Sequence, residues 1–500
     1  MMKRYCCLAV VFFSMIMIVG CPPKSTDSRK AGSAIDQESS IDMSQEVNFD
    51  TQLGSYGGGY GETTDDYGYS PIPVINVPPV VQPAADEPAK PVVEEKAVAE
   101  EMPAVEEEEA PPAGQTTELQ EIVINTEEIS DQDLPLLEIP ADEPIMEEKT
   151  MKITKDVFGQ MPDNGGQVDV YTLTNAQGAS MKVLTLGGII FELNLPDKDG
   201  KFGNVSANLE TVDDYMTRSP NFGTLVGRYG NRIAKAKFSI DGQEFQLTAN
   251  DGENLLHGGK NGFHKQLWTI EEWQGDDFVG LKLSLVSDEA MQGFPGTVDC
   301  LVTYKFDNNN DLEIVYTATT DKPTPINLTQ HTYFNLSAFT TPTILGETMM
   351  INAESFIPVD PTLIPTGEIA PVEGTPMDFR NPTAIGERIE QVGDDPKGYD
   401  HCYVLKQANP GELTLCAKAA DSVTGRTMEI WTTEPGVQFY TGNFLNGNLN
   451  AFGVTYPKNA AYCLETQHYP DSPNQPTFPN TILRPGETYQ TTTVFKFGVQ

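Results

Sequence analysis

Short alternating runs of apolar and polar residues dominate the chain from about residue 150 onward. Leu281, Leu283 and Leu285 are separated by single polar residues, and a period of two is typical of a half-buried β-strand. Similar runs are found at 301–306, 312–319, 437–442, 462–467 and 491–497. This part of the sequence shows no long helical periodicity and no repeat of fixed length. The pattern predicts an all-β domain, a large antiparallel β-sandwich over residues 149–500.

One β-hairpin can be located closely. Phe238 and Ile240 precede Asp241-Gly242, and Phe245 and Leu247 follow at the same spacing. Asp-Gly is a preferred pair for a two-residue turn with positive φ, so the pattern predicts a hairpin centred on this pair.

The N-terminus has the order of an export signal. Lys3 and Arg4 precede an apolar run at 8–19, which is short for a membrane span. The run ends in Ile-Val-Gly-Cys at 18–21 and resembles a bacterial lipobox. We therefore expect residues 1–20 to be a signal peptide and Cys21 to carry the lipid that holds an exported protein on a bacterial membrane. An uncleaved anchor or a plain secretory signal are the alternatives.

Residues 21–148 are Pro-rich and acidic and lack sustained apolar periodicity. Such a segment cannot bury enough apolar surface to fold, so it is predicted to be a disordered tether. The alternative is an acidic arm that binds cations or a cell-wall partner. Residues 22–150 carry 30 acidic and 6 basic side chains, a net charge of −24 out of −40 for the chain. The negative charge argues against nucleic acid as a partner.

Seven cysteines occur, and three of them lie at or before Cys21. The others are Cys300, Cys402, Cys416 and Cys463. Four cysteines allow three pairings. Free buried thiols are an equally good expectation, because a domain of this size does not need disulfides for stability.

All five histidines lie in the predicted sandwich, and histidine is the natural proton donor or acceptor near neutral pH. His331 opens His-Thr-Tyr-Phe-Asn. If this is a strand, His331, Tyr333 and Asn335 share one face. A polar face of this kind suggests the wall of a pocket, although an isolated histidine is more often held by hydrogen bonds in a core or at a surface.

Two further strands place polar side chains on one face. Glu465 and Gln467 alternate with Leu464, and Gln438 and Tyr440 flank Phe439. A carboxylate on an apolar strand is costly unless it is used or paired. Glu465 is therefore either a functional group or a buried ion-pair partner.

Three segments carry glycines beside polar residues. Asn231 and Arg232 follow Gly230, His257 precedes Gly258-Gly259, and Asp400 follows Gly398-Tyr399. Glycine lets backbone approach a ligand closely. Each signal is weak alone, since the glycines can be simple turns and the arginine a surface ion pair.

Taken in order, these segments resemble the aldose 1-epimerase (galactose mutarotase) family over essentially the whole predicted sandwich. The matching strings are GRYGNRIA, KFSIDG, NLLHGG, GFHKQLW, GFPGTV, TPINLTQHTYFNL, IPTGEI, GTPMDFR, GYDHCYVL, TTEPGVQFYTGN and CLETQHYPDSPN. Gly230 stands where alanine is usual, and Glu253 where proline is common.

The resemblance implies a mutarotase that interconverts the α and β anomers of a free aldohexose, such as galactose or glucose, on a large β-sandwich. His331 would be the general acid and Glu465 the general base. Asn231, Arg232, His257, Asp400 and Gln438 would bind the sugar. No cofactor and no metal is expected, and the chain is expected to act as a monomer or weak dimer that meets the membrane only through Cys21.

Three rivals remain open at this point. A glycoside hydrolase would pair Glu465 with a second carboxylate, Asp400 or Asp471. A silent sugar-binding module would use the same pocket without turnover. A hexose-phosphate epimerase should carry more basic residues than this acidic domain does.

Overall fold

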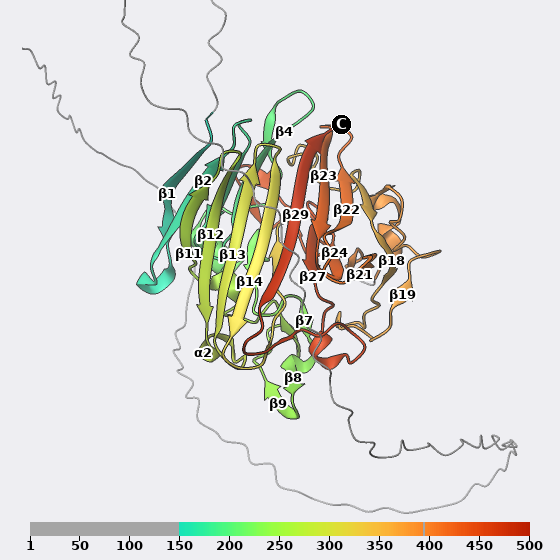
Figure 1. Ribbon diagram of the computed structural model, residues 1–500. Coiled ribbons are helices and arrows are strands. Elements are labelled where there is room, and N and C mark those ends of the chain that lie inside the picture. Colours follow the sequence, from blue (N-terminus) through green and yellow to red (C-terminus); the bar gives the residue numbers. More distant parts are fainter. Residues whose placement is uncertain (1–149, 394–395) are drawn as a thin grey trace, which may run out of the picture. The chain divides into compact units, whose positions relative to one another are not determined.

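The computed structural model describes residues 150–393 and 396–500. The predicted signal peptide, the predicted lipidation site at Cys21 and the whole of the predicted tether lie outside the described residues. Figure 1 shows that strands dominate the described part. Every pairing between named strands there is antiparallel, and only two short α-helices are present. The prediction of an all-β antiparallel domain is confirmed.

The largest sheet has nine strands in the order β11-β12-β13-β14-β29-β23-β22-β17-β20. Figure 1 shows its long strands β12, β13, β14 and β29 side by side. The strands are β11 (Thr269–Gln274), β12 (Phe278–Ser287), β13 (Val298–Asp307), β14 (Asp311–Thr320), β29 (Tyr489–Val499), β23 (Arg426–Thr432), β22 (Thr414–Ala420), β17 (Thr348–Ile351) and β20 (Thr383–Ala384).

Two five-stranded sheets accompany the large sheet, in the orders β1-β2-β3-β4-β5 and β19-β18-β21-β24-β27. The first consists of β1 (Lys152–Gln160), β2 (Gln167–Thr174), β3 (Ser180–Leu184), β4 (Ile190–Pro196) and β5 (Phe202–Asn204). The second consists of β19 (Ala370–Pro371), β18 (Ala353–Phe356), β21 (Asp400–Leu405), β24 (Gly436–Tyr440) and β27 (Cys463–Gln467).

Short strand pairs and single helical turns complete the described part. The pairs are β6 (Thr224–Val226) with β16 (Thr329–His331), β7 (Arg232–Ile233) with β10 (Leu255–Leu256), β8 (Lys237–Ile240) with β9 (Gln243–Gln246), β15 (Thr324–Pro325) with β28 (Ile482–Leu483) and β25 (Asn450–Ala451) with β26 (Val454–Thr455). The helices are α1 (Val212–Thr217) and α2 (Glu289–Gln292), with 3₁₀ turns η1 (Pro162–Asn164), η2 (Ala234–Ala236), η3 (Phe263–Lys265), η4 (Ile385–Glu387), η5 (Ile389–Gln391) and η6 (Ser472–Asn474).

One hydrophobic core joins the three large sheets. Met181 and Leu193 from the first sheet, Tyr304 from the nine-stranded sheet and Phe439 and Leu464 from the third all belong to the same buried cluster. Apolar faces of three sheets are thereby removed from water together, which is the main stabilising contribution in a sandwich.

The predicted hairpin and strands are present. β8 and β9 pair across Asp241 (φ 52°) and Gly242 (φ 83°), the two positive φ values of a tight hairpin turn. The alternating leucines lie on β12, where Leu281 and Leu283 are fully buried. In the described residues all four cysteines are free and buried, so no disulfide contributes. No helix there is long and apolar enough to cross a membrane.

Candidate active site

A cavity of about 210 Å³ collects most of the polar residues that the sequence singled out. It is lined by Pro220, Asn221, Asn231, Arg232, Leu256, His257, His331, Tyr333, Asp400, Tyr440, Phe444 and Glu465. The lining combines hydrogen-bonding groups with aromatic rings, as small-molecule sites do. It is smaller than the pockets of drug-sized ligands, roughly 300–1,000 Å³.

Strands β24 and β27 form one wall of the cavity. Phe439 packs on the aromatic ring of Tyr399 with centroids 5.3 Å apart, which fixes the apolar face of β24 in the core. The alternation of the strand then turns Gln438 and Tyr440 to the opposite face. Gln438 is in direct register with Glu465, so the predicted polar faces of these two strands are adjacent.

Asp400, at the start of β21, is held on the same wall. The Gln438 Nε2 amide donates a hydrogen bond of 2.7 Å to Asp400 Oδ1. Gln438 is not one of the residues that line the cavity. It acts on the cavity only by holding the Asp400 carboxylate, which does line it. The bond orients an acceptor group toward the space beside Glu465.

The β7–β10 pair brings Asn231, Arg232 and His257 together. The His257 N–H donates to the Asn231 carbonyl oxygen at 3.0 Å, and the Asn231 N–H donates to His257 Nδ1 at 3.2 Å. Because Nδ1 accepts, the proton of the neutral imidazole is on Nε2. His257 therefore offers a ring N–H as a donor to a ligand.

Glycine is required after His257 by a close contact between two chain segments. Gly258 has a φ of +76°, and a Cβ placed there would lie 2.1 Å from the carbonyl oxygen of Gly227. No side chain fits at that distance. The Gly-Gly pair is thus more than a simple turn, because it lets the His257 loop lie against the 227–232 loop.

His331 and Glu465 face each other at the centre of the site. His331 Nε2 lies 3.6 Å from Glu465 Oε1, and the two side chains are 5% and 2% exposed. On its other edge, His331 Nδ1 is 3.4 Å from the Cys463 thiol. The His257 ring packs edge-on against the His331 ring, with centroids 4.9 Å apart.

Burial shifts the pKa values of both groups toward their uncharged forms. Desolvation lowers the pKa of His331 to about 4. Desolvation, and then the negative charge of Asp400, raise the pKa of Glu465 well above its usual value, while Arg232 opposes this shift. Buried groups resist charging in this way. At pH values between the pKa of His331 and that of Glu465, the two side chains together hold one proton. A catalyst that both donates and accepts a proton needs this state.

The structure corrects one sequence expectation. Residues 331–335 do not form one strand, because β16 ends at His331. Tyr333 still lines the cavity, and its ring stacks on His331 at 5.2 Å. Asn335 does not, because its amide donates to the Ala460 carbonyl and its Oδ1 accepts from Ser337 N–H in a buried turn.

Asp251 is an important residue that the sequence did not indicate. Arg232 Nε donates to Asp251 Oδ2 at 2.8 Å. The pairing fixes the guanidinium at the cavity and offsets its charge. Pro220, Asn221, Leu256 and Phe444 also line the cavity without any signal in the sequence pattern. Asp471 lies outside the lining and bonds Ala234 N–H and the Asn474 side chain, so it is no partner for Glu465.

One group of side chains in the described residues has a spacing that suits a metal ion. Ligand atoms of His257, His331 and Glu465 all lie within 4.8 Å of one another. Two neutral imidazoles and a carboxylate would be a reasonable ligand set for zinc. They are also the groups that proton transfer needs.

A buried histidine–carboxylate pair, ringed by hydrogen-bond donors and acceptors on an antiparallel β-sandwich, defines an enzyme site for a small polar molecule. Comparison with known proteins agrees: the aldose 1-epimerase profile matches residues 169–496. The rat galactose mutarotase is 42% identical over 350 residues, covering 70% of this chain and 99% of that protein. The Escherichia coli aldose 1-epimerase is 34% identical, covering 67% of this chain and 96% of that protein.

A solved structure shows the same architecture. The galactose 1-epimerase of Lactobacillus acidophilus superposes with a TM-score of 0.61 at 26% identity, covering 70% of this chain and 99% of that one. The chain belongs to the aldose 1-epimerase family, and it is an isomerase that acts on carbohydrates.

Proposed function

We propose that the chain interconverts the α and β anomers of a free aldohexose, galactose or glucose, through the opening and closing of the sugar ring. The observation that carries the proposal is the His331–Glu465 pair, 3.6 Å apart and closed off from solvent in a cavity that fits a small polar molecule. Two groups that share a proton, one within reach of each reacting oxygen, are the minimum that this reaction needs.

The reaction proceeds in balanced proton steps. Glu465 removes the proton of the C1 hydroxyl while the C1–O5 bond breaks, and the electron pair of that bond goes to O5. His331 protonates O5 with the shared proton of the pair, which passes to it from Glu465 before the carboxylate acts as the base, and an open-chain aldehyde remains. Rotation about C1–C2 presents the other face of the carbonyl. Closure follows with the roles exchanged, so the pair ends with the proton count it started with.

The other cavity residues hold the sugar. His257 Nε2–H and the Arg232 guanidinium donate hydrogen bonds, Asp400 accepts them, and Asn231 and Gln438 complete the set. These groups are already oriented by hydrogen bonds or an ion pair to the protein. Preorganisation of this kind holds the substrate in a reactive position and lowers the entropic part of the barrier.

Polarimetry of freshly dissolved α-galactose and α-glucose tests the proposal. We expect the full chain to exceed the spontaneous rate, and His331→Asn to lose about 100- to 10,000-fold of the enzymatic rate. His264→Asn is the matched control, because His264 lies outside the cavity. EDTA should leave the rate unchanged if proton transfer suffices. A wild-type rate equal to the spontaneous rate, or full activity in His331→Asn, would refute the assignment.

We further propose that the enzyme works outside the cytoplasm and is anchored to a membrane by a lipid attached to Cys21. The support comes from the sequence of residues 1–21. Fractionation of cells carrying Cys21→Ser tests this, since the variant should leave the membrane fraction; retention there would contradict lipid anchoring.

A further inference from the structure

A second cavity of about 800 Å³ lies where the turn before β24, the residues after β27 and the start of β29 meet. It shares no lining residue with the active-site cavity. Its size falls in the range of ligand pockets, roughly 300–1,000 Å³. The mutarotase chemistry proposed above makes no use of it.

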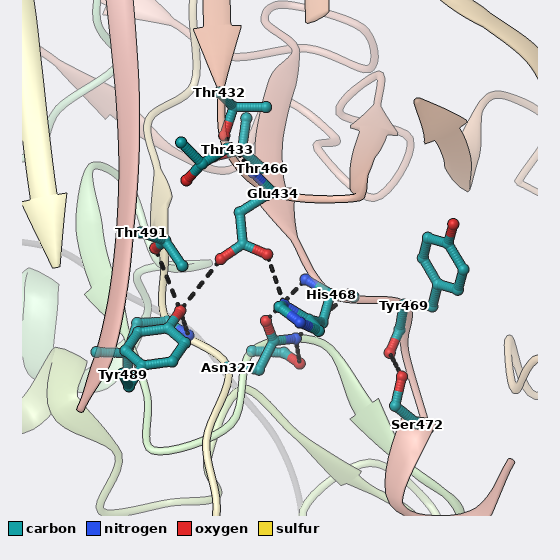
Figure 2. Close-up of polar contacts among 12 residues, drawn as sticks. Asn327, Thr432, Thr433, Glu434, Thr466, His468, Tyr469, Ser472, Tyr489 and Thr491 are labelled. Atoms are coloured by element: carbon teal, nitrogen blue, oxygen red, sulfur yellow. Dashed lines mark hydrogen bonds and ion pairs between the residues drawn. The ribbon is translucent and has the colours of Figure 1, made fainter. Parts of the chain in front are cut away.

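A buried carboxylate orients one histidine of this cavity. The Glu434 side chain is 1% exposed, and its Oε2 lies 2.6 Å from His468 Nδ1 (Figure 2). Tyr489 Oη donates to Glu434 Oε1 at 3.2 Å. The carboxylate therefore holds Nδ1–H toward itself and leaves Nε2 on the other edge of the ring. His468 lines the cavity and is partly exposed there.

Free hydrogen-bonding groups surround this histidine. Within the described residues no partner bonds His468 Nε2, and none bonds the side-chain amide of Gln490. Thr433, Thr491 and Thr492 also line the cavity, but the Thr433 hydroxyl already bonds the Thr492 backbone and the Thr491 hydroxyl donates to Tyr489 Oη. Leu405, three prolines and one aromatic residue, Tyr469, supply the apolar part.

The near absence of charged side chains in the lining of this cavity disfavours ionic ligands. Apart from His468 its lining has no ionisable side chain that is charged at neutral pH, and Glu434 directly behind the imidazole offsets a charge on the ring. An anion would gain little net attraction, and a cation would meet the imidazole first. A neutral ligand with many hydroxyl groups suits amides, hydroxyls and an oriented ring nitrogen better.

We propose that this cavity is a second carbohydrate site, which binds a short neutral oligosaccharide without converting it. The pocket is almost four times the volume of the active-site cavity, so it can take several sugar rings. The site lies on the same sandwich as the mutarotase pocket and would keep the enzyme on saccharide material. The inference is independent of the catalytic roles proposed for His331 and Glu465.

The competing interpretation is that Glu434 and His468 only tie the fold together. Asn327 supports that interpretation, since its Oδ1 accepts from the His468 N–H at 3.0 Å and its carbonyl accepts from the Gly230 N–H at 2.6 Å. A purely structural tie predicts no saccharide binding at this cavity.

Calorimetric titration of the full chain with borohydride-reduced trisaccharides of glucose, galactose, xylose and mannose tests the proposal. Their alditol ends have no ring for the active site to open. We expect at least one to bind, with affinity lowered about 3- to 10-fold by Gln490→Leu, as expected for one or two lost hydrogen bonds. Gln490 is exposed, so this variant should fold. Gln243→Leu, an exposed position on β9, is the matched control and should bind normally.

Two further variants separate the outcomes. His468→Gln keeps a donor for Glu434 but removes Nε2, and it should also weaken binding. Asp400→Ala alters the active site and should leave trisaccharide binding unchanged. The proposal is overturned if none of the four probes binds, if Asp400→Ala rather than Gln490→Leu abolishes binding, or if trigalacturonate binds more tightly than every neutral probe.

Discussion

Replacing Glu465 by glutamine should separate a catalytic role of this carboxyl from a structural one. The two side chains have nearly the same shape, so the cavity is preserved while the base is removed. A catalytic carboxyl predicts lost activity with stability kept or increased. A carboxyl that stabilises the fold through its ion pair with His331 predicts that activity and stability fall together.

The expected loss of activity follows from general base catalysis. A positioned base contributes about 100- to 10,000-fold, which corresponds to about 3 to 5 kcal/mol of barrier. The rate of Glu465→Gln should therefore fall toward the spontaneous rate of mutarotation. The Michaelis constant should change much less, because glutamine retains the hydrogen-bonding atoms of the side chain.

The expected gain of stability follows from burial. Glu465 is 2% exposed, and its Oε2 has no hydrogen-bond partner in the described residues. Its neighbour His331, 3.6 Å away, has a pKa of about 4 and is therefore neutral at pH 7. Because the pKa of Glu465 is raised in the folded protein, the fold loses stability as the pH rises above the unfolded pKa of about 4.3. The loss is roughly 1.4 kcal/mol for each pH step of one, until the pH reaches the folded pKa. Glutamine removes this pH dependence.

Chemical unfolding at several pH values, together with polarimetry, measures both effects. The difference in unfolding free energy should favour Glu465→Gln increasingly as the pH rises above about 4.3, until the folded pKa of Glu465 is reached. Glu434→Gln is a matched control with the opposite expectation, because Glu434 is equally buried but is bonded by His468 and Tyr489. That variant should lose stability and keep its activity. A Glu465→Gln protein that unfolds more easily at every pH would refute this reasoning.

Three more outcomes are expected. The kcat/KM for α-galactose should rise with pH through about 4, the pKa of His331, and decline at alkaline pH, because the catalytic pair must hold one proton. A polarimetric rate that does not change with pH would contradict this. Gly258→Ala should lower stability by about 1–3 kcal/mol and raise KM, because its Cβ would collide with the Gly227 carbonyl; an unchanged melting temperature would count against the close contact. Burial lowers the pKa of His468, but the Glu434 carboxylate outweighs burial and raises it. The stability that this ion pair contributes is therefore complete below about pH 6.5 and is lost as the pH rises through the folded pKa of His468, which urea unfolding of His468→Gln against wild type should show.

The local structure of the sandwich could be predicted because its signals are local. Alternation over Leu281, Leu283 and Leu285 indicates a strand without reference to the rest of the chain, and Asp241-Gly242 specifies its own turn. The order of strands could not be predicted in the same way. β14 pairs with β29 in a register that places Leu312 opposite Phe495. No local pattern encodes a pairing between strands so far apart in sequence.

The site shows the same division. His331, Glu465, His257 and the paired Gln438 and Asp400 could be proposed because the residues beside them match a family pattern. Asp251 could not, because an exposed-looking Asp in a polar loop carries no signal until folding places it 2.8 Å from Arg232. The end of β16 at His331 could not be predicted from the sequence either. Beyond this point hydrogen bonds of the Asn335 side chain replace strand pairing, and one of them is formed with the distant residue Ala460.

The Arg232–Asp251 pair bears on which sugars the site can accept. A phosphorylated sugar would need an unpaired cation in the cavity, because charge-assisted bonds supply most of the attraction for phosphate. The cationic side chain that lines the described cavity is Arg232, and its Nε is already committed to Asp251. Asp400 and Glu465 line the same cavity and add acceptors or negative charge. An anionic substrate would therefore be repelled where a neutral aldose is held, which favours a free hexose over a hexose phosphate.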